Sequence, residues 1–176
     1  AVFGNDISTL PDYPAEIRAP AGTLAGVSGF QVNLSSQDVL TPGDSPQVLV
    51  AMNPAALKSN LPDVETGGIV IVNTDAFTRN NLQKAGYESN PLEDESLSSY
   101  QVYPIPLTTV NREALADVEG LSTKEKDRSQ NFFALGIVFW MFDRQVNTTR
   151  QWLEKKFAKR PVVVEANSKA LMAGYH

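Results

Sequence analysis

The amino-acid sequence predicts an α/β fold of three layers, in which helices flank a mostly parallel sheet. Two strongly apolar runs, residues 47–52 and 69–72, are typical of buried strands. Each run leads into a polar turn and then a short helical pattern, which is the order of a parallel βα unit. The chain has 176 residues, 42% of them hydrophobic, and this is enough to bury one sizeable core. We therefore expect one domain across residues 1–176.

The first half of the chain supplies the predicted strands. Residues 30–34 alternate apolar and polar side chains, as a half-buried strand does. After the strand at 47–52, Asn53 can cap a helix whose first position is taken by Pro54. The β-branched run at 69–72 is too apolar to face water, so we expect it to be a central parallel strand.

The second half is mainly helical in pattern. Short helices are expected at 80–85, ended by Gly86, and at 111–117. Between them we expect a strand at 102–107, whose two prolines either place it at a sheet edge or limit the strand to the first half of this run. Ser122 and Glu125 have the spacing of a capping box, and the helix that they begin runs into the apolar stretch 132–142. We expect most faces of that stretch to be buried, with two further helices at 147–159 and 162–173.

Composition excludes several classes of function. The net charge of −5, without a long basic run, does not suit a nucleic-acid partner. The chain has no cysteine, so it offers no disulfide, thiol nucleophile or iron–sulfur ligand, and this fits a reducing compartment. The single histidine is His176 at the end, which leaves no Ser-His-Asp triad and no His/Cys metal site. No apolar run is long enough to span a bilayer, so we expect a cytoplasmic protein without a membrane partner.

Two segments stand out as candidate sites. Residues 12–29 combine prolines with closely spaced glycines before a strand, which is typical either of a docking or binding loop or of a plain connection. Asn73, Thr74 and Asp75 follow the predicted central strand, where open α/β sheets place ligands, or they form a polar cap on that strand. The acidic run at 90–96 predicts a solvated loop.

Several stretches resemble one known family in the same order along the chain. Residues 1–6, 14–32 (PAEIRAPAGTLAGVSGFQV) and 48–61 (VLVAMNPAALKSNL), followed by shorter matches at 90–92, 129–136, 156–159 and 165–174, are similar to the N-terminal part of the alpha subunit of 2-oxoacid:ferredoxin oxidoreductases. The 2-oxoglutarate type is the most similar. The resemblance covers essentially the whole chain.

This resemblance implies a gamma-type α/β domain, which in the family precedes a thiamine-binding domain of the same polypeptide. The complex would convert a 2-oxoacid and coenzyme A to an acyl-coenzyme A and reduce ferredoxin. Thiamine diphosphate, Mg²⁺ and 4Fe-4S clusters would be held by other alpha-subunit domains or by the beta subunit, so we expect a non-catalytic docking domain with no catalytic residue and no metal ligand. The chain would then be a fragment of a larger subunit, truncated at both ends. The alternative is a free-standing α/β binding or assembly module.

One loop carries the residue-level resemblance. The positions that match the family pattern, and that the resemblance places at an interface near the active site or the coenzyme A entry, are Pro14, Glu16, Arg18, Pro20, Gly22 and Thr23. The guanidinium of Arg18 suits planar, bidentate contacts, so it can meet a carboxylate, phosphate or carbonyl across that interface. Equally, it can pair with Glu16 inside the same domain.

Overall fold

The computed structural model describes residues 6–12, 27, 29–35 and 45–176. The chain forms two compact units, Ala1–Ile105 and Pro106–His176. Each unit is described below by itself. The single domain expected from the sequence stays a prediction.

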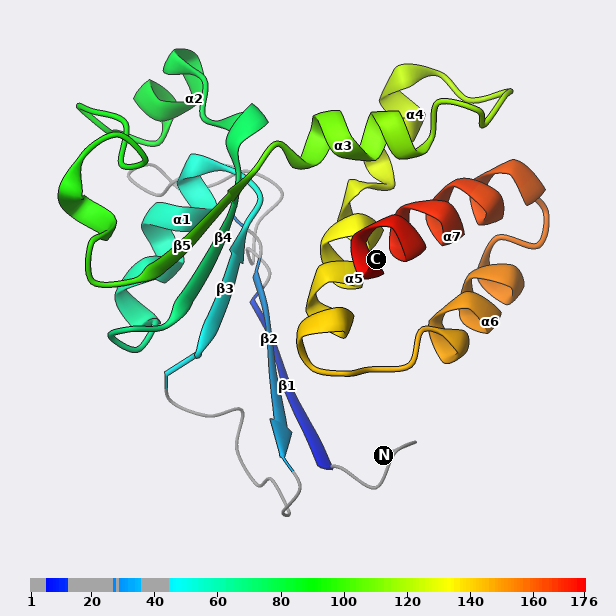
Figure 1. The fold of residues 1–176 in the computed structure, drawn as a ribbon, viewed down its shortest axis with the longest axis horizontal. Helices are drawn as coiled ribbons and strands as arrows, with labels where there is room; N and C mark the ends of the chain where they lie inside the picture. The colour runs from blue at the N-terminus through cyan, green and yellow to red at the C-terminus, as the bar shows by residue number, and fades with distance from the viewer. Residues whose placement is uncertain (1–5, 13–26, 28, 36–44) are drawn as a thin grey trace. The chain divides into compact units, whose positions relative to one another are not determined.

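The first unit contains a parallel three-stranded sheet in the order β3-β4-β5 (Figure 1). The strands are β3 (Val48–Ala51), β4 (Ile69–Asn73) and β5 (Gln101–Ile105). The expectation of a central parallel strand is confirmed for β4. Val70 and Val72 are 0% exposed on one face of β4 and Ile71 is 2% exposed on the other, because successive side chains point to opposite faces.

Short helices connect these strands and cover part of the sheet. They are α1 (Pro54–Asn60), η1 (Leu61–Asp63), η2 (Thr74–Ala76), α2 (Arg79–Lys84) and η3 (Glu95–Leu97). Leu57 of α1, Phe77 after η2 and Leu97 of η3 pack in one core cluster with side chains of β3 and β4. The predicted helix start is confirmed, because Asn53 Oδ1 accepts a hydrogen bond of 2.8 Å from the backbone N–H of Ala56.

A second sheet in this unit consists of the antiparallel strands β1 (Asp6–Asp12) and β2 (Gly29–Ser35). β2 matches the strand expected at 30–34. β1 was not expected from the sequence, because Pro11 and Asp12 are typical of a loop rather than of a strand interior. Both residues lie at the end of the strand, where Asp12 is paired with Gly29.

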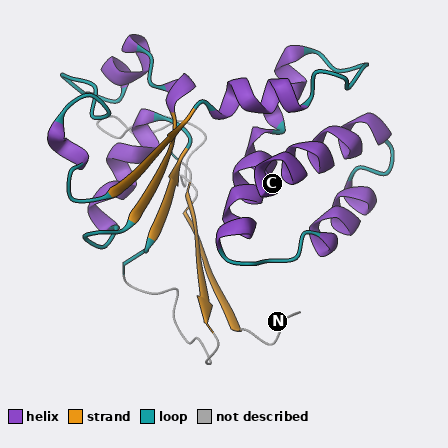
Figure 2. Cartoon of the chain, in the orientation of Figure 1, coloured by secondary structure: helices purple, strands orange, loops and turns teal. Residues whose placement is uncertain are grey.

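The second unit, in which every residue is described, consists of helices and their connections (Figure 2). Its helices are α3 (Leu107–Ala114), α4 (Thr123–Arg128), α5 (Gln130–Met141), α6 (Asn147–Lys156) and α7 (Pro161–Tyr175). α3 begins four residues earlier than expected, because β5 already ends at Ile105 and Leu107 is fully buried. The capping box of Ser122 and Glu125 is confirmed, but the helix that it begins breaks at Ser129.

Helices α5 and α7 lie side by side at very close range (Figure 1). A methyl group added at Gly136 of α5 would lie 2.2 Å from the carbonyl oxygen of Leu171, and one at Gly174 of α7 would lie 2.0 Å from the carbonyl oxygen of Phe133. The expectation that most faces of α5 are buried was wrong. Its buried residues are Phe133, Ala134 and Gly136, whereas Trp140 is 65% exposed. Within this chain, α5 is covered on only part of its circumference.

Candidate functional site

The six loop positions singled out by the sequence lie outside the described residues. They are Pro14, Glu16, Arg18, Pro20, Gly22 and Thr23. The strands on either side of them are described, and Asp12 pairs with Gly29 across the β1–β2 ladder. Residues 13–28 therefore connect two paired strands. Hairpin connections usually contain about two to five residues, and connections above about 12–15 residues are uncommon and often functional. The choice between a docking or binding loop and a plain connection stays a prediction.

The second sequence candidate lies at the carboxyl end of β4, as expected. Asn73 is 2% exposed, and Thr74 and Asp75 begin the 3₁₀ turn η2, with Asp75 exposed. Polar groups nearby bind the backbone: Thr78 caps α2, and the side-chain amide of Asn81 donates to the carbonyl oxygen of Ala76 at 2.9 Å. These bonds come from Thr78 and Asn81, whereas Asn73 makes no side-chain cap hydrogen bond at the start of η2, so the polar-cap interpretation also stays a prediction. A ligand at this edge stays a prediction.

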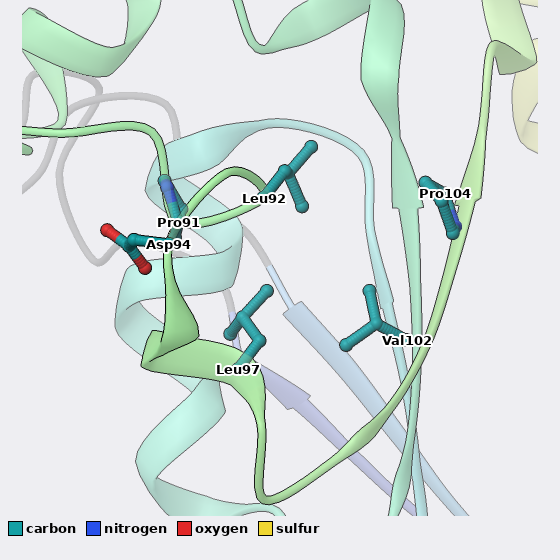
Figure 3. A pocket seen from close by; sticks show the side chains of 6 residues that line it. All are labelled: Pro91, Leu92, Asp94, Leu97, Val102 and Pro104. Carbon is teal, nitrogen blue, oxygen red and sulfur yellow. The ribbon is translucent and has the colours of Figure 1, made fainter.

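A hollow of about 220 Å³ opens in the first unit beside β5 (Figure 3). Its lining is mostly apolar and consists of Pro91, Leu92, Leu97, Val102 and Pro104, together with Asp94. Sites for small molecules usually measure about 300–1,000 Å³ and combine an apolar lining with several convergent polar groups. This hollow is smaller and has one polar side chain. It suits an apolar side chain better than a substrate.

Asp94 is engaged in holding its own loop. Its carboxylate accepts hydrogen bonds from the hydroxyl of Ser89 at 2.6 Å, from the backbone N–H of Ser96 at 2.9 Å and from the hydroxyl of Ser96. These bonds lower the pKa of Asp94, the largest contribution coming from Ser89. Figure 3 shows its carboxylate pointing away from the hollow. The loop at 90–96 is thus solvated at its acidic residues, but Pro91 and Leu97 are buried, which the sequence interpretation missed.

A shallower hollow lies in the second unit, between α3, α6 and α7. Lys169 binds Asp117 at 2.7 Å and Glu165 at 3.4 Å within it. The hydrogen bond with Lys169 lowers the pKa of Asp117, and the same bond raises the pKa of Lys169. Lys169 thus links α7 to Asp117, which lies three residues after the end of α3.

The described residues do not fit an iron–sulfur cluster or a bound metal ion. Among them, no group of three or more His, Cys, Asp or Glu side chains is close enough to hold a metal. The whole chain contains no cysteine, so it supplies no thiolate to a cluster. Within the described ranges, no helix is both long and apolar enough to cross a bilayer.

The comparisons with known proteins agree with one another, because each of them finds oxidoreductases of one kind. The family model described as "Pyruvate ferredoxin/flavodoxin oxidoreductase" matches residues 1–176. The 2-oxoglutarate oxidoreductase subunit KorA of Mycobacterium tuberculosis is 52% identical over all 176 residues, and the chain spans 27% of the length of that relative.

Solved structures share the fold. A 2-oxoglutarate:ferredoxin oxidoreductase from Magnetococcus marinus matches 97% of this chain and 26% of its own, with a TM-score of 0.63 and 24% identity. The gamma subunit of a keto/oxoacid ferredoxin oxidoreductase from Geobacter sulfurreducens matches 97% of this chain and 81% of its own, with a TM-score of 0.55 and 15% identity. A pyruvate oxidoreductase subunit from Thermotoga maritima matches 98% and 79%, with a TM-score of 0.53 and 17% identity.

Proposed function

The chain belongs to the pyruvate ferredoxin/flavodoxin oxidoreductase family, and we propose that it is the gamma-type domain of a 2-oxoglutarate:ferredoxin oxidoreductase subunit. The observation that carries this proposal is the 52% identity with the Mycobacterium tuberculosis subunit along the entire chain. Since the chain spans 27% of that relative, the activity is proposed for a longer protein of which these residues are one part. Its two compact units would together form the domain.

In this proposal the chain positions other domains and carries out no chemical step. The complex would decarboxylate a 2-oxoacid, form an acyl-coenzyme A and reduce ferredoxin. Thiamine diphosphate would supply the stabilised carbanion, and Mg²⁺ and 4Fe-4S clusters would complete the cofactor set. Other domains of the alpha subunit or the beta subunit would hold these groups, and the clusters would need cysteine ligands from there because this chain has no cysteine. The enzyme would be heteromeric and cytoplasmic, and a chain without cysteine fits a reducing compartment.

We further propose that the loop between β1 and β2 contacts another domain near the coenzyme A entry. Support comes from its length, since residues 13–28 greatly exceed an ordinary hairpin connection. Arg18 would offer its guanidinium to a carboxylate, phosphate or carbonyl there. In the full complex, Arg18→Ala should weaken assembly or raise the KM for coenzyme A. Arg18→Lys should recover little, because lysine keeps the charge but loses the planar fork. Unchanged assembly and kinetics in Arg18→Ala would contradict this role.

The alternative function is a free-standing binding or assembly module. The fold similarity to the gamma subunit from Geobacter sulfurreducens, of which the match covers 81%, supports it, because that protein has this fold as a chain of its own. An assay separates the two functions.

The test uses the longest polypeptide that contains these residues, purified with every subunit that accompanies it. We expect ferredoxin reduction that requires both 2-oxoglutarate and coenzyme A, and that is slower with pyruvate. Suppose that a preparation is loaded with thiamine diphosphate and iron–sulfur clusters but does not reduce ferredoxin when any 2-oxoacid is supplied. This result would contradict the proposal. A polypeptide of about this chain's size with no accompanying subunit would favour the free-standing module.

A further inference from the structure

Two apolar side chains of strand β2 are exposed, whereas two polar side chains next to them are not. Phe30 is 59% exposed and Val32 is 47% exposed, whereas Gln31 between them and Asn33 after them are half-buried. In an ordinary amphipathic strand the apolar face is the buried one. The face of β2 that carries Phe30 and Val32, here named the ribbon face, is therefore exposed at these two apolar side chains.

The backbone register shows which positions of β1 lie opposite these residues. β1 is the partner of β2, and the register sets Pro11 opposite Phe30 and Thr9 opposite Val32. Directly paired residues share one face of an antiparallel sheet. A sheet of only two strands has marginal stability in water and needs a further surface packed against it. The ribbon face is the natural position for that surface.

We infer that the ribbon face is the docking surface for an apolar surface on the rest of the same polypeptide. This inference rests on the proposed function, in which the chain is one domain of a longer subunit. The chain spans 27% of the related Mycobacterium tuberculosis subunit, so most of a polypeptide of that length lies outside these residues. A covalently linked surface also has a high effective concentration at this face. Phe30 supplies the large aromatic anchor that interface centres favour.

Photo-crosslinking in the full-length subunit, assembled with its partners, tests the inference. A photoactivatable benzoylphenylalanine replaces Phe30, and the crosslinked peptides are identified by mass spectrometry. We expect crosslinks from position 30 to peptides of the same polypeptide outside residues 1–176. Tyr103 of β5 is the matched control site, because it is also an aromatic strand residue and is 50% exposed. Crosslinks from position 103 to those same peptides should be rare.

Other crosslinked peptides would contradict the inference and would identify what packs against the ribbon face instead. Crosslinks confined to residues 1–176 of the same molecule would mean that the chain covers its own ribbon face. Crosslinks to the other subunit, or between two copies of this one, would mean an intermolecular interface, and an absence of crosslinks would mean an open face. Phe30→Ser should lower the yield of assembled complex more than Tyr103→Ser does. The 2-oxoglutarate-dependent activity of the same preparation is measured separately, so a failed crosslink and a failed functional proposal are distinguishable.

Discussion

Polar side chains at helix ends determine much of the local structure of this chain. Asn53 caps α1, and Ser122 and Glu125 cap each other's backbone at the start of α4. The sequence predicts both features, because a cap depends on residues within one turn. The fully buried Asn111, which donates to the carbonyl oxygen of Lys126 at 3.0 Å, could not be predicted in this way. Its burial depends on how α3 packs against α4.

Glu125 should make the stability of the second unit depend on pH. The hydrogen bond from Arg160 at 2.8 Å is the largest cause, followed by those from Ser122, and together they lower the pKa of Glu125 from 4.5 to about 2. A carboxyl group with a lowered pKa in the folded state stabilises that state when it is ionised. This contribution is complete above about pH 4.5 and should be lost as the pH falls toward about 2.

Unfolding midpoints in urea, measured between those pH values, check this prediction. Glu125→Gln should flatten the pH dependence in this range and should reduce stability mainly at neutral pH. Glu154→Gln, which alters an exposed carboxylate on α6, serves as the control and should leave the profile unchanged. Identical profiles for the natural chain and Glu125→Gln would show that the interactions of Glu125 add no pH-dependent stability.

Some helices and strands could be predicted from the sequence and others could not. β3 and β4 could be predicted because continuous apolar runs between turn residues are typical of buried parallel strands. The break between α4 and α5 could not, because nothing in the residues around Ser129 interrupts a helical pattern. The exposed end of α5 was also missed, since apolar composition does not reveal how much surface neighbouring helices cover.

The crossing of α5 and α7 should not tolerate a side chain at Gly136. A methyl group there would lie 2.2 Å from the carbonyl oxygen of Leu171 and 2.9 Å from backbone atoms of Gly174, so the two helices would have to separate. We expect Gly136→Ala to lower the free energy of unfolding by about 2–3 kcal/mol. Thermal and urea unfolding of the purified protein measure the change.

Gly120 provides a matched control for this substitution. Its added methyl group would contact nothing within 4 Å, but its φ of +78° is unfavourable for alanine. Gly120→Ala should therefore cost about 1 kcal/mol, for the backbone alone. Equal costs for the two variants would show that the crossing adjusts without strain.

Asn53 should contribute to stability through its cap. Asn53→Ala removes the acceptor for the N–H of Ala56 and should cost about 1 kcal/mol. Asn53→Asp keeps an acceptor oxygen and should retain most of that stability. Urea unfolding of both variants measures the difference. If Asn53→Asp lowers the free energy of unfolding as much as Asn53→Ala does, then the side chain of Asn53 does not stabilise the protein through its cap hydrogen bond.

At the scale of the whole molecule, the proposed function depends on residues that this chain does not contain. The fold class could be predicted from hydrophobic patterns, but the interface loop could be assigned only through resemblance to a family. No catalytic constellation was found in the sequence, because the chain has no cysteine and its one histidine is the last residue. A docking domain leaves a weak chemical signal, since its specificity lies in surface shape and in loop length. The proposal of such a role rests on the exposed side chains of the ribbon face and on the length of the β1–β2 connection.

The central claim is that these residues work as one domain of a larger oxidoreductase. Native mass spectrometry of the protein isolated from its source, with peptide mapping beyond both ends of this chain, tests it most directly. We predict a mass far above 19.2 kDa, peptides that continue past His176, and an accompanying subunit that contains iron and sulfide. A single 19.2 kDa species without a partner would contradict the claim and would identify the chain as an independent module.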